Sequence, residues 1–243
     1  MTPDKTPPIL YYHRVSPDAA PETGVTPAQF RDQMRFLKVL GFVGTSLEKA
    51  LACPTGRQGT GVPIALTFDD GYEDNFAFAA PILLELGFTA TIFFVVDRMG
   101  GRADWTTDPV WRGHRLMDVS MARDLVASGF EAGSHTLTHP DLARVDDRKA
   151  REEISGSRER LSHILSCPVT TFCYPYGSFR EGHPAMVRDS GYRAARTVRR
   201  YRPFGKSDRF RLACRPVSGR MGFPRYALTL GAYRLGIKGG DLS

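Results

Sequence analysis

Short apolar runs alternate along this chain with stretches whose apolar residues recur every three or four positions. The runs at residues 64–68 (IALTF) and 89–95 (TATIFFV) favour buried strands. Residues 26–41 have apolar side chains at helical spacing, and they begin with Thr26, a residue type that caps helix N-termini well. The pattern therefore predicts strands and helices in alternation.

The same reading places the remaining elements. Further strands are expected at residues 9–13, 130–135, 169–177 and 192–197, and further helices at 73–87 (kinked at Pro81), 117–129, 146–165 and 183–191. Strands that alternate with helices indicate parallel β/α units, so the predicted class is α/β. In such folds the loops after the strands gather at one face, where sites are built.

Composition is that of a globular protein with a sizeable core. The 243 residues are 42% hydrophobic and 24% charged, which fits a single domain over residues 1–243. No apolar stretch is long enough to cross a bilayer, and the N-terminus lacks the pattern of a secretory signal. These features predict a cytoplasmic protein whose four cysteines are free thiols.

Charge is distributed unevenly. Residues 193–243 carry 13 Lys and Arg against 2 Asp and Glu, whereas residues 1–192 carry a net charge of −4. Apolar residues alternate with arginines over 223–235, as in an interfacial segment, so peripheral contact with an anionic membrane at its inner face is one prediction. Solvated arginines and a segment that completes the fold are the alternatives. Nucleic acid is disfavoured because no nucleic-acid-binding motif is present.

Four polar stretches follow predicted strands: YYHRV (11–15), TFDDGY (67–72), GSHTLTH (133–139) and CYPYG (173–177). His135 and His139 are four residues apart, the spacing that places two imidazoles on one side of a helical turn. With one aspartate of the Asp69–Asp70 pair they would give three ligands for zinc or a similar divalent ion. The other aspartate would stay beside the bound water as a general base. Read alone, the acidic pair fits a turn or a helix N-cap, and the histidines fit simple packing.

Together, TFDDG, SHTLTH and YPYG resemble the motifs of the polysaccharide deacetylases, the NodB-homology carbohydrate esterases, and they occur in that family's order within residues 64–179. The resemblance implies a deformed (β/α)7-type barrel. It also implies metal-dependent removal of N-acetyl, and sometimes O-acetyl, groups from sugars.

Site roles are carried over from the resemblance position by position. Asp69 resembles the catalytic base, and the metal ligands are Asp70, His135 and His139. Tyr176 matches the residue whose backbone N–H acts as an oxyanion donor. The expected cofactor is a divalent metal, zinc first, with cobalt, nickel or iron as alternatives.

Two departures from the family pattern matter. Cys173 stands where most members have an arginine that orients the base, so that interaction must be absent or supplied by another group. The usual late Leu-x-His motif is also missing. However, ILYYHRV (9–15) resembles the start of a circularly permuted subgroup, which makes His13 the candidate general acid. His183 ranks second, and His114 is a further competitor.

The function predicted from the sequence is metal-dependent hydrolysis of an acetyl group from an N-acetylated sugar in a glycan or lipid-linked precursor. Alternatives from other classes are a deformylase or O-acetyl hydrolase, an inactive glycan-binding relative, and a nucleic-acid-binding protein. The sequence leaves the sugar, its linkage and the oligomeric state open.

Overall fold

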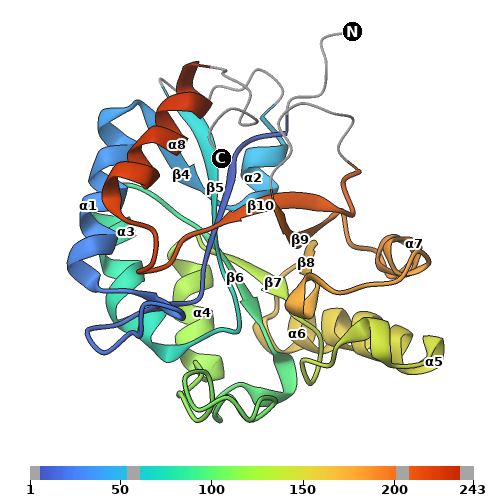
Figure 1. Ribbon diagram of the computed structural model, residues 1–243. Helices are drawn as coiled ribbons and strands as arrows, with labels where there is room; N and C mark the ends of the chain where they lie inside the picture. The colour runs from blue at the N-terminus through green and yellow to red at the C-terminus, as the bar shows by residue number, and fades with distance from the viewer. Residues whose placement is uncertain (1–5, 54–60, 201–207, 236–243) are drawn as a thin grey trace, which may run out of the picture.

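Seven parallel strands close into a barrel in the computed structural model, which describes residues 6–53, 61–200 and 208–235 (Figure 1). Around the ring the order is β1, β10, β9, β8, β7, β6 and β5, and β5 pairs back with β1. The strands are β1 (Ile9–Tyr12), β5 (Val62–Phe68), β6 (Thr91–Phe94), β7 (Glu131–Ser134), β8 (Thr171–Cys173), β9 (Ala194–Arg200) and β10 (Leu212–Pro216). The predicted α/β class and the deformed (β/α)7-type barrel are confirmed.

The barrel is deformed beside β5. Residues 62–65 of this strand pair with β4 (Phe42–Thr45), whereas residues 67–68 pair with β6. Two short strands, β2 (Arg14–Val15) and β3 (Gly24–Val25), pair with each other outside the ring. The extra strand β4 therefore covers the N-terminal half of one edge of β5, and β6 pairs with the rest of that edge.

Helices surround the barrel. In Figure 1, α1, α3 and α8 lie on one flank, and α5, α6 and α7 lie on the other. Their bounds are α1 Pro27–Val39, α2 Leu47–Leu51, α3 Ala80–Glu85, α4 Val119–Ala127, α5 Asp147–Arg151, α6 Ser157–Leu165, α7 His183–Asp189 and α8 Phe223–Leu235. Thr26 caps α1 as predicted: its Oγ1 accepts from Gln29 N, and the Gln29 side chain accepts from Thr26 N.

Two predicted helices are interrupted. A π-helical turn, Asn75–Ala79, precedes α3, which begins next to Pro81, a residue with no N–H to donate to the preceding turn. A second π-helical turn, Glu152–Gly156, separates α5 from α6. The kink expected at Pro81 is thus an irregular turn before it.

Side chains of the strands alternate between the barrel interior and the helix layer. Ile9 and Ala65 belong to a small inner cluster, whereas Leu10 and Leu66 belong to the large outer core. The inner cluster is formed by Ile9, Leu47, Ala50, Ala65, Phe93, Cys173, Ala194, Leu212 and Cys214. This period-2 alternation decides which side chains reach the centre of the barrel.

The C-terminal helix α8 packs on α1. Tyr226 is 1% exposed, and its hydroxyl donates to Gln33 O at 3.3 Å. Leu230 is buried as well, so two of the side chains expected at a membrane surface belong to the core instead, while Phe223 is 45% exposed. Residues 201–207 and 236–243 of the basic segment lie outside the described residues. Within the described ranges, none of the helices combines the length and the apolar character that crossing a membrane requires.

Candidate active site

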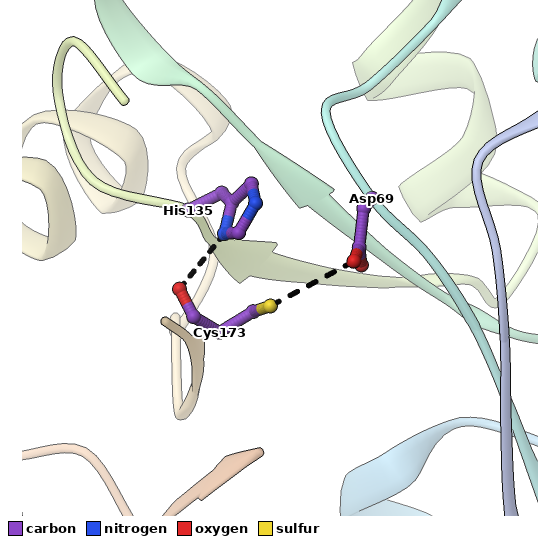
Figure 2. Close-up of side chains that lie close together, drawn as sticks. All are labelled: Asp69, His135 and Cys173. Atoms are coloured by element: carbon purple, nitrogen blue, oxygen red, sulfur yellow. Dashed lines mark hydrogen bonds between the residues drawn. The ribbon is translucent and has the colours of Figure 1, made fainter. Parts of the chain in front are cut away.

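The ends of β5, β7 and β8 bring Asp69, His135 and Cys173 side by side (Figure 2). His135 Nδ1 lies 2.8 Å from the Cys173 carbonyl oxygen, so this nitrogen carries the proton and donates. The Cys173 thiol donates to Asp69 Oδ2 at 3.9 Å. These contacts orient the His135 ring and leave its Nε2 free to act as a ligand.

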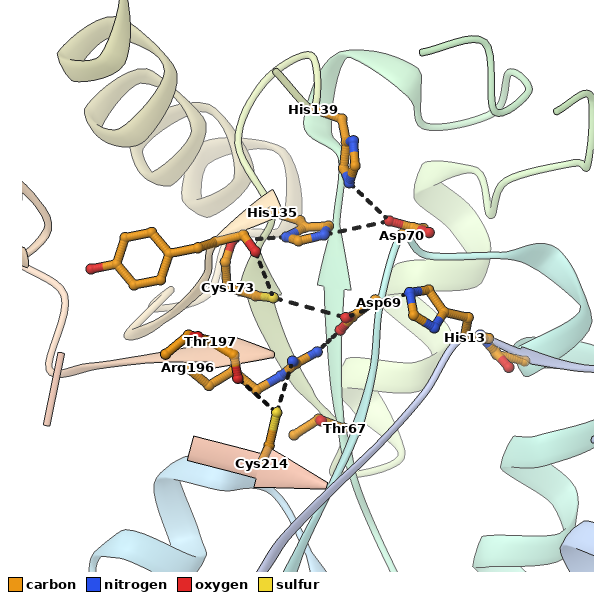
Figure 3. Close-up of polar contacts among 12 residues, drawn as sticks. His13, Thr67, Asp69, Asp70, His135, His139, Cys173, Arg196, Thr197 and Cys214 are labelled. Carbon is orange, nitrogen blue, oxygen red and sulfur yellow. Dashed lines mark hydrogen bonds and ion pairs between the residues drawn. The ribbon is translucent and has the colours of Figure 1, made fainter. Parts of the chain in front are cut away.

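A second set of atoms meets at Asp70 (Figure 3). Its Oδ1 lies 3.4 Å from His135 Nε2 and 3.4 Å from His139 Nε2. All three side chains are buried. Burial raises the pKa of Asp70 to about 7 and lowers that of His135 to about 4. Burial also lowers the pKa of His139, so both imidazoles are neutral near pH 7, as metal ligands must be.

The backbone produces this convergence without a helix. Thr136 and His139 have φ values of 70° and 65°, in the left-handed region, and His139 N donates to Thr136 Oγ1 at 3.0 Å. The four-residue spacing does not act through a helical turn here: a tight loop after β7 brings the two rings together, with their centroids 4.8 Å apart. Left-handed backbone at a β-branched residue is strained, and such strain gathers at functional sites.

The Asp70, His135 and His139 set fits a divalent metal. Bonds of about 2.0–2.2 Å at tetrahedral angles place ligand atoms about 3.3–3.6 Å apart, which matches the two distances of 3.4 Å. Asp70 Oδ1 is buried and has no hydrogen-bond partner among the described residues. A cation would supply the partner that this oxygen lacks.

Asp69, His135 and Cys173 also have ligand atoms within 4.8 Å of one another, but they fit a metal poorly. Burial raises the pKa of the Cys173 thiol, and a metal would need its thiolate. His135 Nδ1 and the Asp69 carboxylate are already engaged by other groups. Cys173 packs in the inner apolar cluster of the barrel instead.

Asp69 points into the barrel, where Arg196 meets it (Figure 3). Arg196 Nη2 pairs with Asp69 Oδ1, and the two side chains are 0% and 2% exposed. The sequence has Cys173 where most family members have an arginine that contacts the base. In this chain an arginine does contact Asp69, but it comes from β9. Sequence reasoning missed Arg196 because both faces of a barrel strand are buried, so YRAART (192–197) does not reveal which residues point inward.

Among the candidate histidines, His13 lies nearest Asp69, with Nε2 3.9 Å from Oδ2. Burial, followed by the charges of Arg196 and His135, lowers the pKa of His13 to about 3. His114 instead contacts Arg14 and the Val110 carbonyl. Both ring nitrogens of His183 face Arg180. The structure thus joins His13 to the site and gives the other two different partners.

Tyr176 lies in the turn after β8. Its φ of 57° is left-handed, and its ring centroid lies 4.7 Å from that of His139. The hydrogen bonds of this turn use the N–H groups of Gly177 and Ser178, which donate to Tyr174 O and Pro175 O. The Tyr176 N–H takes part in neither of these two bonds, and its ring is the part of the residue that contacts His139.

Two tryptophans of the irregular stretch at residues 97–114 line the site. The Trp105 ring centroid lies 4.7 Å from that of His139, and the Trp111 centroid lies 4.8 Å from that of His13. Tyr11 contacts the His13 ring from its own strand. Aromatic rings therefore hold one metal-ligand candidate and the candidate acid.

Comparison with known sequences gives the following relatives. The family model of the polysaccharide deacetylases matches residues 56–195. The Bacillus subtilis (strain 168) protein YxkH, classed as a polysaccharide deacetylase, is 26% identical over 192 residues, which make up 79% of this chain and 64% of that protein. This chain thus spans less than two thirds of that relative. A chitooligosaccharide deacetylase of Sinorhizobium fredii (strain NBRC 101917 / NGR234) is 29% identical over 126 residues, or 50% of each protein.

Solved structures share the fold. The deacetylase PplD of Streptococcus pyogenes, in complex with acetate, has a TM-score of 0.78 at 21% identity and covers 94% of this chain and 99% of its own. IcaB of Ammonifex degensii has the same TM-score and identity, with 93% and 97% covered. At these identities the likeness concerns the barrel itself.

Proposed function

This chain belongs to the polysaccharide deacetylase family, and we propose that it hydrolyses the acetyl group from an N-acetylated sugar with the help of a divalent metal. One observation carries the proposal: ligand atoms of Asp69 and His135 lie within 4.8 Å of each other, which places the Asp69 carboxylate beside the buried set of Asp70, His135 and His139. A general base next to three metal ligands is an arrangement suited to hydrolysis by water.

Asp70, His135 and His139 would hold the metal, and zinc is the ion we propose for two imidazoles and one carboxylate. Cobalt, nickel and iron accept the same donors. When bound, the ion would lower the pKa of a water molecule and polarise the acetyl carbonyl. The His135–Cys173 contact keeps Nε2 of His135 directed to that position.

The residues of the chain then act on the water and the amide. Asp69 takes a proton from the attacking water, because its carboxylate is buried and next to the ligand set. The Tyr176 N–H donates to the carbonyl oxygen as negative charge develops on it. Asp69 directly follows β5, and Tyr176 lies in the turn after β8. Attachment to the ends of barrel strands limits the motion of both residues.

His13 delivers a proton to the leaving nitrogen. Because its pKa lies well below neutrality, its ring starts the reaction neutral and must first receive the proton that it gives. Asp69 Oδ2, 3.9 Å from His13 Nε2, is the neighbouring group that can supply it. The water proton thus reaches the amine through Asp69 and His13.

A circularly permuted barrel is part of the proposal. It is supported by β1, the strand before His13, which lies between β10 and β5 and closes the ring. In a permuted family member, the N-terminal strand would take the position that the last strand holds in other members.

Acetate release from N-acetylated sugars, including oligomers and lipid-linked sugars, tests the proposal. The zinc-loaded protein is expected to release acetate, and Asp69→Asn to lower kcat by at least about 100-fold, within the range of general acid–base catalysis. Asp124→Asn, a change of the same type at an exposed position, is the matched control and should leave kcat unchanged.

Other outcomes separate the alternatives. Release of formate, or of acetate from O-acetyl sugars alone, would replace the N-acetyl assignment with another acyl group. A zinc-loaded protein that binds sugars and hydrolyses none of them would indicate a binding relative. Equal kcat for Asp69→Asn and Asp124→Asn would refute the role given to Asp69.

A further inference from the structure

Arg196 is the largest fully buried side chain of the described residues, with 0% of its surface exposed. Its guanidinium lies in the barrel interior, with its central carbon 4.8 Å from the ring centroid of Tyr11 and 5.0 Å from that of Phe93. Nη1 donates to Cys214 Sγ at 3.5 Å, and the Cys214 thiol donates to the Thr197 carbonyl. The position of the guanidinium is thus fixed on several sides.

Burial of the charged Arg196 guanidinium inside the barrel is unfavourable unless another interaction compensates for it. Arginine keeps its proton in proteins, and a buried ion pair contributes little net stability because both charges lose their hydration. The partner of Arg196 is Asp69, through Nη2 and Oδ1. The other carboxylate oxygen, Oδ2, is the one that lies near His13 and Cys173. The ion pair therefore fixes one oxygen and directs the other.

We propose that Arg196 is the positioning residue of Asp69: it binds Oδ1 so that Oδ2 faces the attacking water and His13. The inference rests on the proposed function, because it gives Asp69 the role of base. Arg196 itself touches neither the water nor the sugar in this account.

Strand register explains why the arginine can come from β9. Cys173 of β8 and Arg196 of β9 are direct partners across the two parallel strands. Both side chains reach Asp69 from inside the barrel, Cys173 at Oδ2 and Arg196 at Oδ1. A long cation is needed at only one of these two paired positions, because both side chains already reach the same carboxylate. The two positions should therefore be exchangeable.

An exchange experiment tests this inference with Arg196→Ala, Arg196→Lys and the double variant Arg196→Ala/Cys173→Arg. Arg196→Ala is expected to lower kcat about 100-fold, the size of effect that follows when a reacting group is misplaced by about 1 Å. KM and zinc content should stay unchanged. Arg196→Lys should recover part of the loss, and the double variant should exceed Arg196→Ala at least about 10-fold.

Crystal structures of the variants give a readout that needs no activity. In Arg196→Ala the Asp69 carboxylate should turn away from its position in the unmodified chain, and in the double variant it should return. If the unmodified protein releases no acetate, the proposed function fails, whereas the orientation of Asp69 in these structures still decides the role of Arg196.

Two results would overturn the inference. One is a folded Arg196→Ala protein with unchanged kcat and an unmoved Asp69. The other is a folded double variant that is no more active than Arg196→Ala, with Asp69 still displaced. If Arg196→Ala does not fold, a folded double variant in which Asp69 has its original orientation would still support the proposal. If neither the double variant nor Arg196→Lys folds, Arg196 has a structural role only, and the proposal fails.

Discussion

Asp69 and Asp70 are neighbours in sequence with opposite surroundings. Asp69 pairs with the Arg196 guanidinium inside the barrel. Asp70 has a left-handed φ of 69°, which turns its side chain toward His135 and His139. Two adjacent carboxylates avoid mutual repulsion because one already has a cation and the other faces a site for one.

The residues at the strand ends could be predicted from the sequence, and the residue within a strand could not. Asp70, His135 and Tyr176 all lie at or just beyond the ends of predicted strands, where the loops of parallel strands meet. Arg196 lies inside β9, and its partner Asp69 is more than 100 positions away. Only the register of the barrel brings these two together.

His13 gives a prediction about pH and stability. The unfolded chain binds a proton at His13 below a pKa of 6.5, whereas the folded chain resists protonation down to about 3. The free energy of unfolding therefore falls on acidification through this window, by up to about 1.4 kcal/mol per pH unit from this residue. Between pH 7 and pH 5, metal-free wild type should lose as much as about 2 kcal/mol more than His13→Gln.

Urea unfolding at the two pH values measures this difference. His163→Gln, at an exposed position of α6, should show the same loss as wild type. If His13→Gln loses as much stability as wild type, the His13 ring is not held neutral in the folded protein.

At the scale of elements, the turn after β5 determines where both aspartates point. Gly71 in this turn has a φ of 73°, and a Cβ there would lie 2.8 Å from Phe94 Cδ1 on the next strand of the ring. Gly87, after α3, has a similar φ of 72° with nothing within 4 Å. These two glycines separate the cost of a left-handed backbone from the cost of a steric clash.

Gly87→Ala should lower the free energy of unfolding by about 1–2 kcal/mol, the cost of left-handed backbone for an L residue. Gly71→Ala should lose a further 1–3 kcal/mol or so from overpacking, and it should also weaken zinc binding because Asp70 moves. Chemical denaturation and zinc titration of both variants check this. Equal losses for the two, with unchanged zinc affinity, would mean that the turn adapts freely.

Elements with a clear period and cap were predictable, such as α1 behind Thr26. The loop from His135 to His139 was not, because its spacing equals that of a helical turn while left-handed residues produce the actual contact. β4 and β10 were missed as well: each is short and lacks a long apolar run. The pattern of apolar and polar residues therefore predicts an element only where neighbouring residues alone determine the backbone conformation.

At the scale of the whole molecule, closure of the barrel creates the site. β1 joins β10 to β5, and this pairing brings His13 next to Asp69. Alternating strands and helices predicted the α/β class, but the number of strands and the closure came from the family resemblance, because pairings between distant strands leave no local signal. The contacts of α8 with α1 add the C-terminal helix to the same body.

The decisive measurement is the activity of metal-free protein as zinc is added, recorded as acetate released from an N-acetylated sugar. Activity should rise linearly and level off at one zinc per chain, equally in His163→Ala, and it should not rise in His135→Ala at that stoichiometry. Activity that survives complete metal removal, or that rises equally in His135→Ala, would contradict the proposed metal dependence.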